Sequence, residues 1–141
     1  MPLQHILILS SSLCISTFAL ATGSNLDITV HGVRDSQGTV RAALFNSPEG
    51  FPKETKAMAH AAVLAKTGSV LLQFADLPPG KYAAIVYHDE NNDEQMDKRF
   101  GMIPIEGYGL SNNVRVFGKP SFKECAFDIP ATKSQTIDLR Y

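Results

Sequence analysis

The stretch SVLLQFADLPPGKYAAIVYHD (Ser69–Asp89) decides the fold that this sequence predicts. A strand pattern runs to Phe74 and is stopped by the turn Pro78-Pro79-Gly80, because proline has no amide hydrogen for a strand ladder. The segment 81–88 that follows is rich in Tyr, Ile and Val and is apolar at nearly every position. Such a segment is typical of a strand that is buried on both faces. We therefore expect it to be the central strand of a sheet.

Strand patterns also flank this centre. Upstream, NLDITVHGVR (25–34) alternates apolar and polar residues, the turn DSQG (35–38) follows, and TVRAALFN (39–46) resumes the pattern. Together these segments predict a β-hairpin. Downstream, SFKECAFDIP (121–130) and SQTIDLRY (134–141) predict two more short strands.

One segment is ambiguous between helix and strand. KETKAMAHAAVLA (53–65) follows the loop SPEGFP (47–52), and its alanines favour a helix, whereas its position between strands favours a strand. We take it as a strand. About seven short strands, turns between them and no strong helical period then predict an all-β fold, a two-sheet antiparallel sandwich.

The N-terminal segment MPLQHILILSSSLCISTFALA (1–21) contains no Lys, Arg, Asp or Glu, and it predicts a secretory signal peptide. Its apolar part, Ile6–Leu20, is shorter than the roughly 20 residues that cross a bilayer. Ala19 and Ala21 supply the small side chains that a signal peptidase requires. An uncleaved N-terminal anchor is the alternative. We expect a periplasmic or secreted protein with no membrane span after cleavage.

The rest of the chain, 22–141, suits a single domain with one core. The net charge is −1 and no basic run is present, so nucleic acid is not expected as a partner. After cleavage Cys125 would be the one remaining cysteine, and it could form no internal disulfide. Its alternating neighbours predict a small buried hydrophobic side chain.

A long irregular loop, 89–119, is the place where we expect function, because long loops inside small domains tend to be functional. It starts in HDENNDEQMD (88–97), which holds five carboxylates and two asparagines in ten residues. Part of this stretch has the spacing of a calcium loop. The candidate ligands, at its first, third, fifth, seventh and ninth positions, are Asp89, Asn91, Asp93, Gln95 through its backbone carbonyl, and Asp97.

Two positions depart from a calcium loop. Glu94 stands where glycine normally supplies a positive φ, and Phe100 stands where a bidentate glutamate normally closes the site. Glu106 could return to complete the shell. The alternative is a solvated acidic turn that Lys98 and Arg99 offset, and the sequence leaves both interpretations open.

The same loop offers residues for two further interpretations. His88, Asp89 and Glu106 suggest acid/base groups of a small hydrolase of glycan or peptide. Neighbours on a strand point to opposite faces, however, so we rather expect the His88 ring to hydrogen-bond the loop. EGYGLSNN (106–113) either presents Tyr108, with Asn112 and Asn113, to a ligand or packs Tyr108 on the sandwich edge.

The combined pattern YHDENNDEQMD, IPIEGYGLSNN and FGKPSFKECAF resembles a family of exported bacterial proteins catalogued as domain of unknown function 2141. The family's form of these motifs is HDxNxNGxxD, GxPxEGYGxSNN and GxPSFxxAxF. Here Glu94 replaces the glycine of the first motif. Met102 stands two residues before the proline of the second, with Gly101 one residue earlier.

The resemblance implies export, a transthyretin-like or prealbumin-like sandwich, and no established activity or catalytic residue. The expected fold is thus a two-sheet antiparallel Greek-key sandwich. The expected function is a non-enzymatic exported module that binds calcium or a ligand through the acidic loop, with an unknown protein or glycan partner. A small hydrolase and a purely structural partner-binding domain are the alternatives.

Overall fold

The computed structural model describes residues 22–141, so the predicted signal peptide lies outside the described residues. The all-β class is confirmed: strands dominate, and the helices are three short segments in this part of the chain. The strands are β1 (Ser24–Val33), β2 (Thr39–Phe45), β3 (Ala59–Leu64), β4 (Gly68–Leu77), β5 (Gly80–Asp89), β6 (Lys98–Arg99), β7 (Ile103–Pro104), β8 (Tyr108–Leu110), β9 (Phe127–Ile129) and β10 (Ser134–Asp138). The helical segments are the 3-10 turns η1 (Glu54–Lys56) and η2 (Ser111–Asn113), and α1 (Phe122–Cys125).

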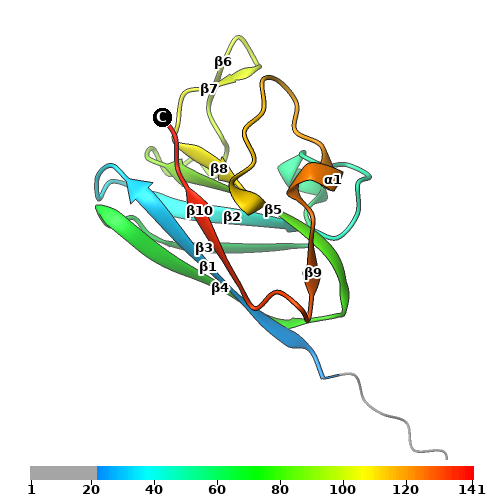
Figure 1. The fold of residues 1–141 in the computed structure, drawn as a ribbon. Coiled ribbons are helices and arrows are strands. Elements are labelled where there is room, and N and C mark those ends of the chain that lie inside the picture. Colours follow the sequence, from blue (N-terminus) through cyan, green and yellow to red (C-terminus); the bar gives the residue numbers. More distant parts are fainter. Residues whose placement is uncertain (1–21) are drawn as a thin grey trace, which may run out of the picture.

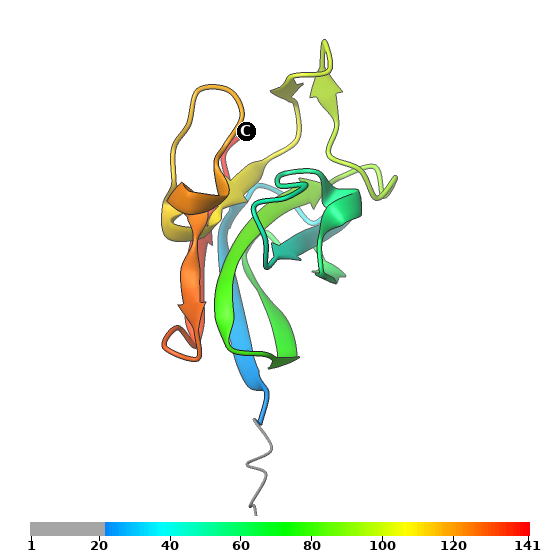
Figure 2. The same cartoon turned by 90° about the vertical axis from the view of Figure 1, so that its right-hand side faces the viewer.

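Two main sheets form the body of the molecule (Figure 1). One has the order β10-β1-β4, and the other has the order β3-β2-β5-β8 with β9 also paired to β5. The β6-β7 ribbon stands apart and projects from one end in both views (Figure 2). The Greek-key connectivity and the transthyretin-like form stay predictions.

The main core lies between the two sheets. It is built by alternate residues of β1 and β4 that meet alternate residues of β2 and β5, among them Leu26, Ile28, Val30, Leu72, Val40, Leu44, Ala84 and Val86. A second apolar cluster lies on the other face of β2 and β5, where Phe51, Leu110 and Cys125 cover Phe45 and Ile85. β5 is apolar throughout because both of its faces are covered. Its predicted central position in the sheet is confirmed.

Cys125 is confirmed as a buried free cysteine. Its side chain belongs to the second cluster. Burial raises the pKa of the thiol to about 11, and the nearby Glu124 adds to the effect. The thiol therefore stays protonated near neutral pH, as expected of a cysteine that only packs.

The predicted hairpin of 25–34 with 39–46 is wrong. β1 pairs with β4 and β10, whereas β2 pairs with β3 and β5 in the other sheet. The turn 35–38 therefore carries the chain from one sheet to the other, so that each strand buries its apolar face against the opposite sheet. Gly38 has a φ of +69°, and a Cβ there would overlap the carbonyl oxygen of Asp89. The turn is thus packed directly on the end of β5.

Three further expectations need correction. The segment 121–130 is a strand only in β9, because the Ser121 side chain caps the short helix α1 by accepting from the Glu124 N–H. The pairing is not wholly antiparallel, since β1 and β10 are parallel. The loop 89–119 is not irregular throughout, because it contains β6, β7, β8 and η2. These three short strands explain why the structure has more strands than the roughly seven that the sequence predicts.

Other expectations agree with the structure. The ambiguous segment 53–65 holds strand β3 after the single turn η1, and 134–141 contains β10. No helix in residues 22–141 is long and apolar enough to cross a membrane.

Candidate functional site in the acidic loop and the adjacent groove

Asp89 anchors the acidic loop, which we define as residues 89–97. Its side chain is fully buried at the end of β5. One carboxylate oxygen accepts from the N–H of Asp93 at 3.1 Å, and the other accepts from the N–H of Glu94 at 3.0 Å. Hydrogen bonds to an ionised acceptor are strong, so Asp89 closes the first turn of the loop from within.

Glu106 is the second buried carboxylate and is 5% exposed. Its oxygens accept from the N–H of Glu90 and from the N–H of Asp97, each at 3.1 Å. The side chain therefore returns to the loop and joins its two ends. Burial raises the pKa of Glu106, and the two N–H groups only partly oppose that shift.

The exposed residues of the loop also interact with one another. The Asn91 amide nitrogen donates to Asp97 at 2.8 Å and to Asp93 at 3.3 Å, and the Gln95 N–H donates to Asp93 at 2.9 Å. All five predicted ligands thus lie in one compact turn. Among residues 22–141, however, no group of three or more His, Cys, Asp or Glu side chains is arranged to hold a metal ion. Calcium binding stays a prediction.

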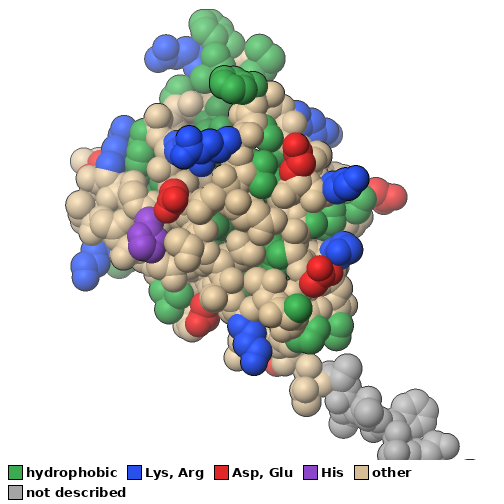
Figure 3. All heavy atoms as spheres, viewed as in Figure 1, with side chains coloured by type: hydrophobic (Ala, Val, Ile, Leu, Met, Phe, Trp, Pro, Cys, Tyr) green, Lys and Arg blue, Asp and Glu red, His purple; other side chains and the backbone are tan. Residues whose placement is uncertain are grey.

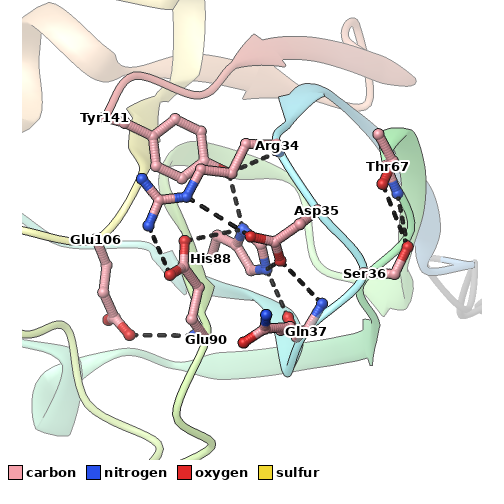
Figure 4. A network of polar contacts seen from close by, with 9 residues as sticks. All are labelled: Arg34, Asp35, Ser36, Gln37, Thr67, His88, Glu90, Glu106 and Tyr141. Atoms are coloured by element: carbon pink, nitrogen blue, oxygen red, sulfur yellow. Dashed lines mark hydrogen bonds and ion pairs between the residues drawn. The ribbon is translucent and has the colours of Figure 1, made fainter.

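His88 points to the opposite side of β5, and the expected hydrogen bond to the loop is wrong (Figure 4). Its Nε2 lies 2.6 Å from the Gln37 carbonyl oxygen, and its Nδ1 lies 2.7 Å from the Tyr141 hydroxyl. A carbonyl only accepts, so Nε2 carries the proton. The Tyr141 oxygen also accepts from the Arg34 N–H at 3.0 Å, so the Tyr141 hydroxyl joins the His88 ring to the backbone after β1.

Charged groups surround this buried ring. Arg34 donates to Glu90 at 2.6 Å, and its guanidinium lies 4.5 Å from the centre of the Tyr141 ring. Asp35 and Glu90 each place a carboxylate oxygen within 3.8 Å of the His88 ring. The hydrogen bond that Arg34 donates to Glu90 raises the pKa of Arg34, so the guanidinium remains charged. The cluster links the end of β1 to the end of β5.

A groove of about 980 Å³ lies beside the acidic loop, on the outer face of β2, β3 and β5. Its floor includes Arg41, Ile85 and Tyr87. Pro52 to Thr55 form one wall, and Asp93 to Met96 with Lys98 form the other. His88, Asp89 and Glu106 are not among its lining residues, and all three are at most 5% exposed. This arrangement favours a structural role for them over an acid/base role.

Polar groups converge on the groove floor. The Tyr87 hydroxyl contacts both carboxylate oxygens of Glu54, at 3.0 and 3.1 Å, and burial raises the pKa of Tyr87. Arg41 Nη1 lies 3.5 Å from Glu94, whereas Arg41 Nε is buried with no hydrogen-bond partner within the described residues. The groove therefore holds an incompletely paired cation beside a rigid tyrosine-glutamate pair.

The comparisons agree with the sequence motifs. The model of a family described as an uncharacterised protein conserved in bacteria, domain of unknown function 2141, matches residues 28–138. The chain belongs to this family. No curated protein and no solved structure matches the chain.

Both departures from the motifs of domain of unknown function 2141 fall at left-handed turns. Glu94 adopts a φ of +63° although it carries a side chain, so the loop keeps the turn that glycine would make. Gly101, with a φ of +69°, follows Phe100 at the turn between β6 and β7. Met102 is 77% exposed there and is free of packing constraints.

The remaining predicted residues of this family member hold the fold together. Tyr108 is partly buried and exchanges two backbone hydrogen bonds with Arg140. Asn112 donates to the Ala126 carbonyl at 2.9 Å, and Asn113 accepts from the Asp138 N–H at 2.8 Å. These contacts favour packing on the sandwich edge over presentation to a ligand.

Sequence reasoning missed the groove residues Arg41, Glu54, His60 and Tyr87. The alternation of residues along β2 and β5 could have indicated two of them. Arg41 and Tyr87 are paired across the two strands, and both face away from the main core. Glu54 reaches the groove only because η1 folds back over the sheet, which no local pattern indicates. His60 lies on β3 and reaches the groove beside Ala43 of β2, with which it pairs.

Proposed function

We propose that this protein is an exported, non-enzymatic binding module whose groove takes a small carboxylate ligand such as an acidic sugar. The observation that carries the proposal is Arg41. Its side chain is 18% exposed in the groove floor, and Glu94 is the one carboxylate within 4 Å of it among the described residues. A guanidinium offers donors in a planar fork that fits a carboxylate, and the exposed part of the Arg41 side chain presents such donors to the groove.

The surroundings of Arg41 suit such a ligand. Glu94 is 72% exposed and lies 3.5 Å away, so this contact is weak and a ligand can displace it. Tyr87 and Glu54 offer a fixed hydroxyl and carboxylate to sugar hydroxyls. Pro52, Ile85 and Met96 add apolar surface. Small-molecule sites commonly combine an apolar lining with a few fixed polar groups.

The test is a calorimetric titration with glucuronate and with glucose, which differ at the carboxylate. We expect glucuronate to bind and glucose to bind at least about tenfold more weakly, a ratio typical of losing one charged hydrogen-bonded contact. Arg41→Ala should abolish the difference. Arg115→Ala removes an exposed arginine that does not line the groove, and it should leave binding unchanged. Equal binding of both sugars, or none of either, would overturn the acidic-sugar proposal.

Calcium is the second candidate, and the turn at Glu94 favours it. The N–H groups of the fifth and sixth positions donate to Asp89, and Glu94 adopts the positive φ of a calcium loop. The Asn91 amide nitrogen lies between the carboxylates of Asp93 and Asp97. A cation at that place would reduce the repulsion between the two carboxylates more than the neutral amide does. The atoms that would coordinate calcium are carboxylate and amide oxygens, which calcium prefers as ligands.

Titration with calcium tests this second candidate. We expect heat and a raised melting temperature for the wild type and neither for Asp93→Ala. Asp128→Ala is the matched control, because it removes an exposed carboxylate on β9 that pairs, among residues 22–141, only with Lys81. Absence of heat at millimolar calcium would remove the calcium site. If neither ligand class binds, the structural partner-binding alternative is the one that remains.

Export is supported by the apolar segment Ile6–Leu20 and by the small residues Ala19 and Ala21. A non-enzymatic role is supported by the burial of His88, Asp89 and Glu106, whose hydrogen bonds are all made within the fold.

A further inference from the structure

Two loops rise at the same end of the molecule, and we call them the apical loops. The first is 98–105, which contains the β6-β7 ribbon, and the second is 114–120, between η2 and α1. Both reach the end opposite the start of β1 in the two ribbon views (Figures 1 and 2). Neither belongs to the two main sheets.

The apical loops expose large apolar side chains at their tips. Phe100 is 83% exposed, Met102 is 77% exposed, and Phe117 is fully exposed. Hydrophobic side chains stand at this end of the space-filling view, next to basic ones (Figure 3). Large apolar side chains exposed together at one end of a molecule are typical of a surface that meets a partner or a membrane.

The backbone at the first tip sharpens this observation. Phe100 and Gly101 have φ values of +54° and +69°, and the Met102 N–H donates to the Arg99 carbonyl at 3.2 Å. Two successive positive φ values make a tight primed turn, which favours Asn or Gly and strains a bulky aromatic residue. Neither packing within the fold nor backbone preference accounts for phenylalanine at this position.

The charges of the apical loops have one sign. Lys98, Arg99, Arg115 and Lys119 are exposed, and neither loop contains Asp or Glu. The chain as a whole has a net charge of −1, so the apical loops are more basic than the molecule as a whole. The apolar tips are therefore flanked only by cations.

We propose that the apical loops dock on a bilayer surface of anionic phospholipids, with Phe100, Met102 and Phe117 in the headgroup region. The cations complement lipid phosphates, and aromatic side chains favour the interface between water and hydrocarbon. A lipid surface fits better than a protein partner, because two narrow separate tips offer little of the roughly 800 Å² per side that a stable protein interface buries. Lys98 also lines the groove, whereas Phe100, Met102 and Phe117 do not, so this proposal does not rest on the groove ligand.

The chain contains no tryptophan, so Phe100→Trp introduces a single fluorescent probe at the tip. The measurement uses protein lacking residues 1–21, because every element of the fold lies in 22–141 and the apolar N-terminal segment would itself bind lipid. Vesicles of phosphatidylcholine alone are compared with equal mixtures of phosphatidylcholine and phosphatidylglycerol. Leu64→Trp is the matched control, because Leu64 is 81% exposed on β3, away from the apical loops.

With anionic vesicles we expect the tryptophan emission of the Phe100→Trp variant to shift to the blue and to be quenched by brominated lipid, and we expect no shift for the Leu64→Trp variant. Adding Phe117→Ser to the Phe100→Trp variant should lower the partition coefficient by about tenfold, and adding Lys98→Glu with Arg99→Glu should lower it further at low salt. No shift, equal shifts of both probes, or equal binding to neutral vesicles would overturn the proposal. Absence of vesicle binding would assign the apical loops to a protein partner instead.

Discussion

At the scale of single residues, Asp89 and Glu106 shape the acidic loop from beneath. Each side chain is buried and accepts two backbone N–H groups of the loop. Buried carboxylates with unmet acceptors are costly, so these bonds explain how two acidic groups lie inside a small domain. The carboxylates that face solvent are different residues, Asp93 and Glu94 among them.

Glu106 gives the loop a defined response to pH. Burial raises its pKa in the folded state, so the folded protein takes up the proton at a higher pH than the unfolded chain does. Between those two pKa values the folded state holds more protons, and lowering the pH therefore adds stability from this group. Glu106→Gln removes the titration. The measurement is the unfolding free energy in urea, at several pH values, for the wild type and for this variant. As the pH is lowered from 7 to 4.5, we expect the wild type to gain stability relative to the variant. A difference that does not change with pH would contradict the assignment.

At the scale of elements, the sequence indicated which strands are buried better than it indicated which strands pair with one another. β5 was predictable as the central strand because its two apolar faces are covered by two different clusters. The partner of β1 was not predictable, because the turn 35–38 suits a hairpin as well as a crossing between sheets. Only the long-range pairing with β4 and β10 decides between them.

The short helix α1 shows a local signal that strand alternation obscured. Ser121 and Glu124 have the spacing of a capping box, and the Ser121 oxygen accepts from the Glu124 N–H at 3.3 Å. Ser111 has no such signal. It accepts from the Ala84 N–H at 3.0 Å and donates to the Cys125 carbonyl at 2.6 Å, so it fills the gap on β5 between β8 and β9.

The sequence likewise predicted one part of the candidate site and missed the other. The acidic loop was visible in the sequence because its residues are contiguous. The groove was not, since its lining comes from four strands, η1 and the acidic loop together. Glu106 was expected as a residue that could return to complete a calcium shell, and that role stays a prediction; in the structure its oxygens accept backbone N–H groups at both ends of the loop.

At the scale of the whole molecule, Tyr141 connects the two sheets at one edge. Its hydroxyl meets Arg34, which follows β1, and His88, which belongs to β5 in the other sheet. Its ring lies at 6.0 Å from the His88 ring, and a Cβ on Gly107 would come within 2.5 Å of it. Gly107 thus permits the close approach of the tyrosine that joins both sheets.

Tyr141→Phe tests this connection, because it removes the hydroxyl and keeps the ring. The Arg34 N–H and His88 Nδ1 would lose their partner, and an unsatisfied group of this kind costs about 1–3 kcal/mol. We expect a lower unfolding free energy by that amount in urea denaturation. Tyr108→Phe is the matched control, since the Tyr108 hydroxyl makes no hydrogen bond within residues 22–141, and it should change stability by less than about 0.5 kcal/mol. Equal effects of the two substitutions would show that the Tyr141 hydroxyl does not hold the sheets together.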